Sequence, residues 1–181
     1  PTTSHQSLVV SHQFLVYLNM RTLIVAILLL LSGVVFAQSN VGLMIEGEIT
    51  NEDGKRYKDA ARIILKKDTL APDTMKIKGG GFTLGLDYDS KYTITFDGDN
   101  KYPKKIFIDM TAIPNENRTS SFEMSMDVAL ITKPVIPNQK LEDWHNTVSQ
   151  KLFYSIVDDA MVQDVIYSSE RERLRAQIVG E

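Results

Sequence analysis

The 181-residue chain contains no cysteine. This absence excludes a disulfide framework, a thiolate metal site and a cysteine nucleophile. Residues 31–33 (Leu-Ser-Gly) resemble the start of a bacterial lipoprotein box, but Val34 stands at the position of the lipidated cysteine, which argues against lipidation there. A chain without such crosslinks depends on packing for its stability, and 144 residues after a cleaved leader are enough for one core.

The chain also has few histidines and a small net charge. The chain has three histidines, and two of them, His5 and His12, precede the expected mature chain. The remaining one, His145, has no serine motif of the G-x-S-x-G kind to form a triad with. With 20 basic and 23 acidic residues the net charge is −3, which gives no footprint for nucleic acid or for an anionic membrane. We therefore expect a protein without enzymatic activity and without catalytic residues.

The N-terminal region has the pattern of a secretory signal peptide. Met20 and Arg21 precede 14 apolar residues (23–36), and Val35 and Ala37 occupy positions −3 and −1 of a cleavage site. The alternative is a membrane anchor, but a span needs about 20 apolar residues, and this run reaches that length only by including polar breaks. The expected segments are an upstream stretch without structural role at 1–19, a signal peptide at 20–37, and a mature chain at 38–181 that is exported to the periplasm or cell surface.

In residues 42–130, turn-forming residues recur at the short intervals that are typical of short strands. Apolar and polar side chains alternate along 43–50, as expected for a strand with one buried face. The Asp53-Gly54 pair predicts a tight turn, and Gly79-Gly80-Gly81 predicts the turn of a hairpin. Seven such strands predict a mainly β fold, a seven-stranded antiparallel Greek-key sandwich of prealbumin-like or Ig-like type. They are expected at 43–50, 60–67, 74–78, 82–86, 91–96, 104–110 and 120–130.

A different pattern follows the sandwich. Pro134 and Pro137 predict a hinge at 131–138, because proline interrupts both helices and central strands. Residues 139–181 read as a mainly helical C-terminal extension, in which 151–157 (KLFYSIV) is ambiguous between helix and strand. The first predicted helix is indicated by a candidate N-cap, Asn138, and by the helical spacing of four apolar residues, Leu141, Trp144, Val148 and Leu152.

The sandwich pattern is similar to a known family. Residues 45–67 run from a strand through an Asp-Gly turn to paired alanines and an aliphatic strand. This order resembles the carboxypeptidase regulatory-like domain, a transthyretin-like (prealbumin-like) β-sandwich found in envelope proteins of Bacteroidota, over about half of the chain. Tyr57, Asp59 and the Asn100-Lys101 step depart from the family pattern. The resemblance implies a non-catalytic module and rests on Gly47, Ile49, Gly54, Ala60, Ile63, Gly81, Phe82, Leu84, Tyr92, Ile94, Phe96 and Tyr102.

Two acidic loops offer ligands for a metal ion. Calcium takes six to eight oxygen ligands, and alternate aspartates can provide some of them. These loops lack the twelve-residue spacing with a terminal glutamate, and aspartate is common in turns because it caps its own backbone. We expect no cofactor, with Ca2+ at these loops as the alternative. The residues concerned are Asp87, Asp89, Asp97 and Asp99.

An aromatic face gives a second possible binding site. Tyrosines at strand ends can form a platform for a sugar or a peptide, or they can pack their rings into the core and leave the hydroxyl in water. The platform would make the protein a carbohydrate-binding module, which is the alternative function. It would consist of Tyr88, Tyr92, Tyr102 and Phe107.

The last predicted helix gives a site for a partner. Its alternating charges suit docking on another envelope protein, or they are the solvated side of a helix that folds back over the edge of its own sandwich. Docking makes the protein a structural or protein-interaction module of the envelope, which is the function the sequence favours. The partner's identity and the oligomeric state stay open. The docking residues would be Arg171, Arg173, Leu174, Arg175 and Ile178.

Overall fold

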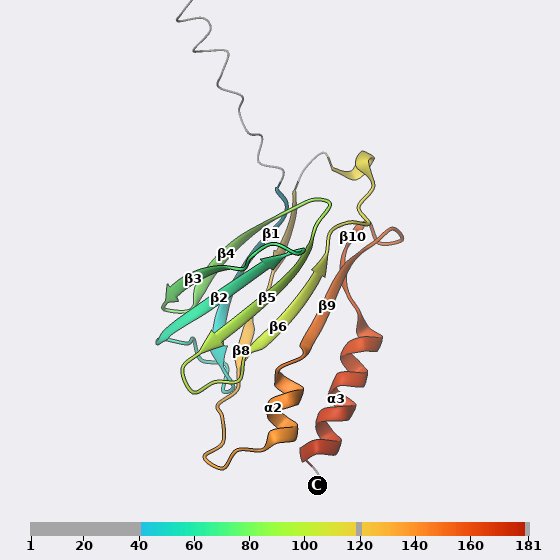
Figure 1. Cartoon of the computed structure of the whole chain (residues 1–181). Coiled ribbons are helices and arrows are strands. Elements are labelled where there is room, and N and C mark those ends of the chain that lie inside the picture. Colours follow the sequence, from blue (N-terminus) through green and yellow to red (C-terminus); the bar gives the residue numbers. More distant parts are fainter. Residues whose placement is uncertain (1–40, 119–120, 180–181) are drawn as a thin grey trace, which may run out of the picture. The chain divides into compact units, whose positions relative to one another are not determined.

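The structure is a computed structural model that describes residues 41–118 and 121–179. The predicted upstream segment and signal peptide lie outside the described residues. Within the described ranges the chain is mainly β, with ten strands in two sheets and two α-helices (Figure 1). The prediction of a mainly β protein with a C-terminal helix is confirmed, whereas the predicted number of seven strands is wrong.

The smaller sheet is built around the first strand, β1 (Val41–Asn51). On one side β1 pairs antiparallel with β4 (Gly81–Asp87). On its other side it pairs with β7 (Phe122–Ser125) and then with β8 (Val128–Leu130), and both of these pairs are parallel. The predicted strand 120–130 is therefore two short strands that follow β1 in turn.

The larger sheet has six strands in the order β10-β9-β6-β5-β2-β3. All neighbours in it are antiparallel except β6 and β9, which are parallel. Its members are β2 (Ala60–Lys67), β3 (Asp73–Lys78), β5 (Lys91–Gly98), β6 (Lys104–Asp109), β9 (Val148–Ser155) and β10 (Ala160–Gln163).

The prediction that all strands pair antiparallel is wrong for a topological reason. The chain leaves β6 at the end of the sandwich where β1 begins, and passes through the 3-10 helix η1 (Asn115–Asn117) before it enters β7 (Figure 1). β7 therefore runs in the same direction as β1. Helix α2 (Gln139–His145) lies in the later connection, which brings β9 alongside β6 in the same direction. A strand pattern in the sequence does not specify these crossings.

The predicted glycine hairpin is a crossing between the two sheets. β3 pairs with β2 and β4 pairs with β1, so the strands on either side of the glycines do not pair with each other. Gly79 and Gly80 have φ angles of 81° and 80°, a region that L side chains rarely adopt. A Cβ on Gly80 would also lie 2.8 Å from the Ile49 carbonyl oxygen. The triplet is needed for the change of sheet rather than for a tight hairpin.

The C-terminal extension contains strands as well as the predicted helices: its two helices have 7 and 15 residues, and its two strands have 8 and 4. The helix predicted through Val148 and Leu152 ends at His145, and both residues lie in β9. The exposed edge of β6 supplies backbone partners, and Leu152 and Tyr154 alternate into the core, so tertiary pairing overrides the apolar spacing. Of the two readings of KLFYSIV, the strand is confirmed. Helix α3 (Val165–Val179) is the last of the described elements.

The two sheets and the extension share one core. The predicted alternation in β1 is confirmed, since Leu43, Ile45 and Ile49 are fully buried. Phe82 of the small sheet packs on Phe96 of the large one with ring centroids 5.1 Å apart. The buried cluster continues into β9, so the segment at 131–138 joins two parts of one compact unit. No helix in the described part of the chain is both long and apolar enough to cross a membrane.

Candidate functional site

The structure does not bring the predicted aromatic platform together. Tyr88, Tyr92 and Tyr102 are buried, at 5%, 2% and 2% exposure. Tyr88 precedes β5 and Tyr102 follows it, so these two lie at opposite ends of that strand. Phe107 is half-buried at an outward position of β6, between the inward Ile106 and Ile108. The prediction of a tyrosine-lined face is wrong because the rings complete the core.

The two acidic loops are likewise separated by the length of β5. Asp87 pairs with Lys67 at 2.7 Å, and Asp97 pairs with Arg62. Asp89 receives two hydrogen bonds from the guanidinium of Arg118, at 2.5 and 2.6 Å. Asp99 lies exposed in the β5–β6 turn. Among the described residues no three acidic or histidine side chains form a group that could hold a metal ion, and calcium at either loop stays a prediction.

The predicted docking helix packs on its own domain through the arginine expected to face a partner. Arg171 is buried, with its guanidinium carbon 4.2 Å from the ring centroid of Trp144. It donates a hydrogen bond of 2.5 Å to the Trp144 carbonyl, and the Trp144 indole donates one of 3.1 Å to the Arg171 carbonyl. We call this reciprocal pair the Trp144–Arg171 clasp. It joins α2 to α3, so α3 is folded back on its own domain through α2.

Only part of the predicted docking set is therefore free to meet a partner. Arg173 and Leu174 are exposed, whereas Ile178 is half-buried. Arg175 is half-buried and lies 5.8 Å above the Trp144 ring. Arg171 belongs to the clasp. The prediction that all five side chains face outwards is wrong because arginines at helical spacing, rather than an apolar stripe, hold α3 in place.

A stack of rings continues the clasp into the sandwich. His145 lies parallel to Tyr102, with ring centroids 4.0 Å apart, and meets Trp144 edge-on at 4.6 Å. Burial lowers the pKa of His145 to about 4, helped by the nearby positive charges of Arg175, Arg171 and Lys133. The imidazole is therefore neutral near pH 7 and serves as a packing ring, in keeping with the absence of a triad.

The β9–β10 hairpin ends in a tip with two exposed apolar residues, Ile156 and Val157, which are 75% and 94% exposed. A polar network fixes the base of this tip. The Tyr154 hydroxyl donates to the Asp159 carboxylate at 2.5 Å, and the Asn117 amide donates to both groups at 2.6 Å. The tip is therefore anchored to η1 as well as to its own strands.

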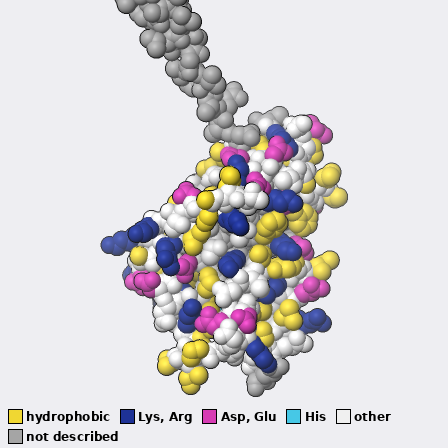
Figure 2. Space-filling view, viewed as in Figure 1, with side chains coloured by type: hydrophobic (Ala, Val, Ile, Leu, Met, Phe, Trp, Pro, Cys, Tyr) yellow, Lys and Arg dark blue, Asp and Glu magenta, His cyan; other side chains and the backbone are white. Residues whose placement is uncertain are grey.

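Exposed apolar side chains concentrate in the same part of the chain. Seven of the ten exposed large apolar residues in the described ranges lie between 153 and 179. Figure 2 shows hydrophobic side chains along the side of the molecule that the hairpin and α3 form. We call this set the C-terminal apolar surface. It consists of Phe153, Ile156, Val157, Val165, Ile166, Leu174 and Val179.

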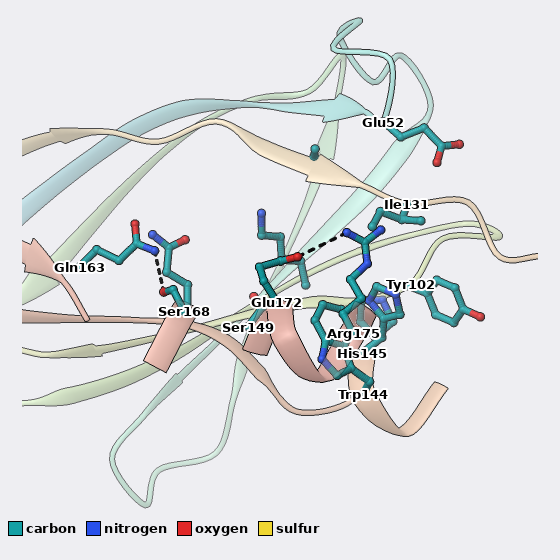
Figure 3. A pocket seen from close by; sticks show the side chains of 14 residues that line it. Glu52, Tyr102, Ile131, Trp144, His145, Ser149, Gln163, Ser168, Glu172 and Arg175 are labelled. Atoms are coloured by element: carbon teal, nitrogen blue, oxygen red, sulfur yellow. Dashed lines mark hydrogen bonds and ion pairs between the residues drawn. The ribbon is translucent and has the colours of Figure 1, made fainter. Parts of the chain in front are cut away.

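A cavity of about 490 Å³ lies where α2 and α3 meet the sandwich (Figure 3). Its wall on the large sheet comes from β6, β9 and the end of β10, and its opposite wall comes from Ala129 in β8 and Ile131 just after it. The side chains that line it are mainly polar. They include Lys104, Ser149, Gln150, Gln163, Ser168, Glu172 and Arg175, with Trp144 and His145 at the α2 side.

Lys104 is the most unusual residue of this cavity. In β6 it occupies the same face as the buried Ile106 and Ile108, so it points towards the interior of the sandwich. Burial lowers its pKa, and Glu172 acts in the opposite direction. No described residue forms a hydrogen bond or an ion pair with the Lys104 amine.

Sequence reasoning missed both the hairpin tip and the cavity. The Asp158-Asp159 pair after an apolar run was an available turn signal, and Ile156 and Val157 are the residues it would have placed at the tip. The cavity had a weaker signal: Lys104 and Gln150 stand in step with the inward apolar residues of their strands, where a core residue is expected.

The chain was compared with known proteins. No protein-family model matches it, and no curated protein does. Among solved structures it has a likeness to a Bacteroides fragilis protein of unknown function that is thought to be membrane-associated, with 19% identity and a TM-score of 0.32. The likeness covers 55% of this chain and 33% of that chain. At this TM-score it carries no argument about fold or function.

Proposed function

We propose that this chain is a non-enzymatic protein of the bacterial envelope, exported to the periplasm or cell surface, that acts as a protein-interaction module. Its β-sandwich is of the carboxypeptidase regulatory-like type and displays the C-terminal apolar surface to another protein. The observation that carries this proposal is the concentration of seven of the ten exposed large apolar side chains in residues 153–179. Exposed apolar side chains mark interaction sites where they lie next to one another, as Ile156 and Val157 do at the hairpin tip.

The anchored hairpin tip supports this role. Binding through a loose loop would carry the entropic cost of ordering it, whereas a tip already held by Asn117, Tyr154 and Asp159 avoids much of that cost. Two branched apolar side chains on a fixed turn resemble the small anchors that fill a pocket on a partner. The tip is therefore the expected centre of the contact.

The chemistry of the surface favours a protein over a lipid membrane as its partner. Positive charges alternate with acidic ones along α3, where Arg173 lies between Glu172 and Leu174 and close to Glu170. An anionic membrane would select a basic face beside the apolar residues, which α3 lacks. An apolar pocket on a second envelope protein does not require basic residues on this surface. Binding of the two proteins should then be insensitive to salt.

Co-purification with matched variants tests the proposal. The full chain, exported and tagged, is purified from cross-linked envelopes as wild type, as Ile156→Ser with Val157→Ser, and as Val135→Ser with Ile136→Ser. Val135 and Ile136 are the control pair because they are 101% and 82% exposed but lie outside the C-terminal apolar surface. We expect one protein to co-purify with wild type and the control pair, and its yield to fall at least tenfold with the tip pair, about 1.4 kcal/mol.

Three outcomes would contradict the proposal. The first is equal recovery of the same proteins with both double variants. The second is loss of the co-purified protein when the cross-linking itself is done in high salt, with no effect of the tip pair. The third is co-sedimentation of the purified wild type, and not of the tip pair, with vesicles of envelope phospholipids, which would make the surface a membrane contact.

A further inference from the structure

The cavity beside α3 has the features of a ligand site rather than of a packing fault. Inward positions of a sandwich are normally apolar. In β6 and β9 this holds for Ile106, Ile108 and Leu152, which belong to the core. Lys104 and Gln150 occupy the next inward positions, towards α3. Close-packed interiors have few voids larger than a water molecule, whereas a polar space of about 490 Å³ has the size of a small-molecule site.

One charged group of the cavity lining favours an anion. Lys104 and Arg175 are the two cations of the lining, and the Glu172 carboxylate lies 3.7 Å from the Arg175 guanidinium. Glu52 lines the opposite side, and Figure 3 shows its carboxylate turned away from the other labelled side chains. It already accepts a hydrogen bond from Thr132 at 3.2 Å. The lining thus has two cations and two acids, and Lys104 is the cation that forms no hydrogen bond or ion pair with a described residue.

The neutral polar side chains of the cavity suit hydroxyl groups. The Gln163 amide donates to the Ser168 hydroxyl at 2.7 Å, and Ser168 donates in turn to the Asp164 carbonyl, which leaves the Gln163 carbonyl oxygen as an acceptor that no described residue uses. No hydrogen bond to the Gln150 side chain is formed within the described ranges. These amides can both donate to and accept from a hydroxyl, as sugar recognition requires.

We propose that this cavity binds a small sugar acid, a single ring of the hexuronate class, whose carboxylate is held by Lys104 and Arg175. The amides of Gln150 and Gln163 receive its hydroxyl groups. Lys104 is the principal contact, because a carboxylate supplies the partner that its amine lacks inside the fold, and a charge-assisted hydrogen bond there is among the strongest that a side chain makes. This site is separate from the exposed hairpin tip and does not depend on the proposed interaction surface.

The single tryptophan allows a direct test, because Trp144 lines the cavity and is the only tryptophan in the chain. The full chain is titrated with D-glucuronate, followed by Trp144 emission and by calorimetry. D-glucose, which lacks the carboxylate, and acetate and inorganic phosphate, which lack the ring, are titrated in parallel. Lys104→Met keeps the aliphatic stem and removes the charge, and Lys66→Met, on the exposed face of β2, is the control.

We expect saturable binding of glucuronate with a change in Trp144 emission, at least tenfold weaker binding of glucose, acetate and phosphate, and at least a tenfold loss in Lys104→Met but not in Lys66→Met. Unchanged thermal unfolding of Lys104→Met shows that the loss is not a folding defect. The proposal is overturned if glucuronate gives no saturable signal, if Lys104→Met binds it like wild type, or if acetate or phosphate binds as tightly as glucuronate.

Discussion

The sandwich core and the C-terminal part of this protein are built on opposite principles. In the region from β1 to β8, branched and aromatic side chains of two sheets fill the interior, and positions such as Leu43, Ile45 and Ile63 are fully buried. In the region from α2 to α3, β9 adds Leu152 and Tyr154 to that core, and cation–aromatic contacts, polar networks and a cavity make up the rest. The same C-terminal region exposes most of the large apolar side chains.

This difference indicates a division of labour. Apolar burial is the largest favourable contribution to folding, so the first region carries the stability. The C-terminal region is joined to the sandwich by β9, but it exposes apolar side chains at its surface and lines a cavity with polar ones. Both features lower stability, and both are expected where a protein binds a partner or a ligand. The predictions below test this division, from the largest expected effect to the smallest.

The largest effect is expected at Gly47 in the core region. A Cβ there would lie 1.8 Å from the Met126 carbonyl oxygen, where the link between β7 and β8 runs alongside β1. The backbone must separate to admit it, so Gly47→Ala should lower the free energy of unfolding by about 3 kcal/mol or more. Gly85→Ala in β4 is the control, because a Cβ there meets side chains at 3.4 Å or more. Equal loss in both variants, measured by urea denaturation, would contradict the role of this close approach.

The next effect tests whether β9 belongs to the core. Leu152 is buried in the common cluster, whereas its neighbour Phe153 is 41% exposed on the other face of the strand. Leu152→Ala should cost about 3 kcal/mol of the free energy of unfolding, and Phe153→Ala less than about 1 kcal/mol. Both variants should unfold in a single transition. Separate transitions for the sandwich and for residues 139–179 would show instead that the extension is an independent tail.

A smaller effect is expected for the Trp144–Arg171 clasp. Arg171→Met keeps much of the stem but removes the cation above the indole and the hydrogen bond to the Trp144 carbonyl. We expect a loss of about 2 kcal/mol and a shift in Trp144 emission as α3 loosens. Arg173→Met, exposed on the same helix, should change neither quantity. If the two variants behave alike, the clasp does not hold α3.

The smallest effect at neutral pH, and a clear one in acid, is expected at His145. Its pKa is lowered from 6.5 to about 4 in the folded protein, so the unfolded chain binds more protons between these values and stability falls as the pH drops through them. His145→Phe keeps a ring between Tyr102 and Trp144 but does not titrate. The melting temperature of the variant should therefore fall less than that of wild type between pH 6.5 and 4. Parallel curves would remove His145 as the cause.

The local pattern of the sequence predicts the strands of the sandwich well but not their partners. Alternation along β1 marks Leu43, Ile45 and Ile49 as buried, because period two is a property of each strand alone. Parallel pairing of β1 with β7 and of β6 with β9 depends on which end of the sandwich a connection returns to, and no residue pattern encodes that. The glycines at 79–81 marked a turn correctly, yet could not distinguish a hairpin from a change of sheet.

The site was less predictable than the fold, because several of its residues lie where the usual sequence patterns would not place them. Arg171 is buried although alternating charges on a helix usually face solvent. Tyr88, Tyr92 and Tyr102 are buried although tyrosines suit a surface platform, and nothing in their spacing separates the two roles. Lys104 points inwards only because the register of β6 places it there. Such assignments need the arrangement of the sheets, which local sequence does not supply.

The most direct test of the account is site-specific photo-crosslinking in growing cells. A photoreactive amino acid is placed at position 157, at the hairpin tip, and in a matched strain at position 135, which is equally exposed but outside the C-terminal apolar surface. The account predicts a discrete protein adduct from position 157 and none from position 135. The absence of an adduct at position 157, or the same adducts from both positions, would contradict it.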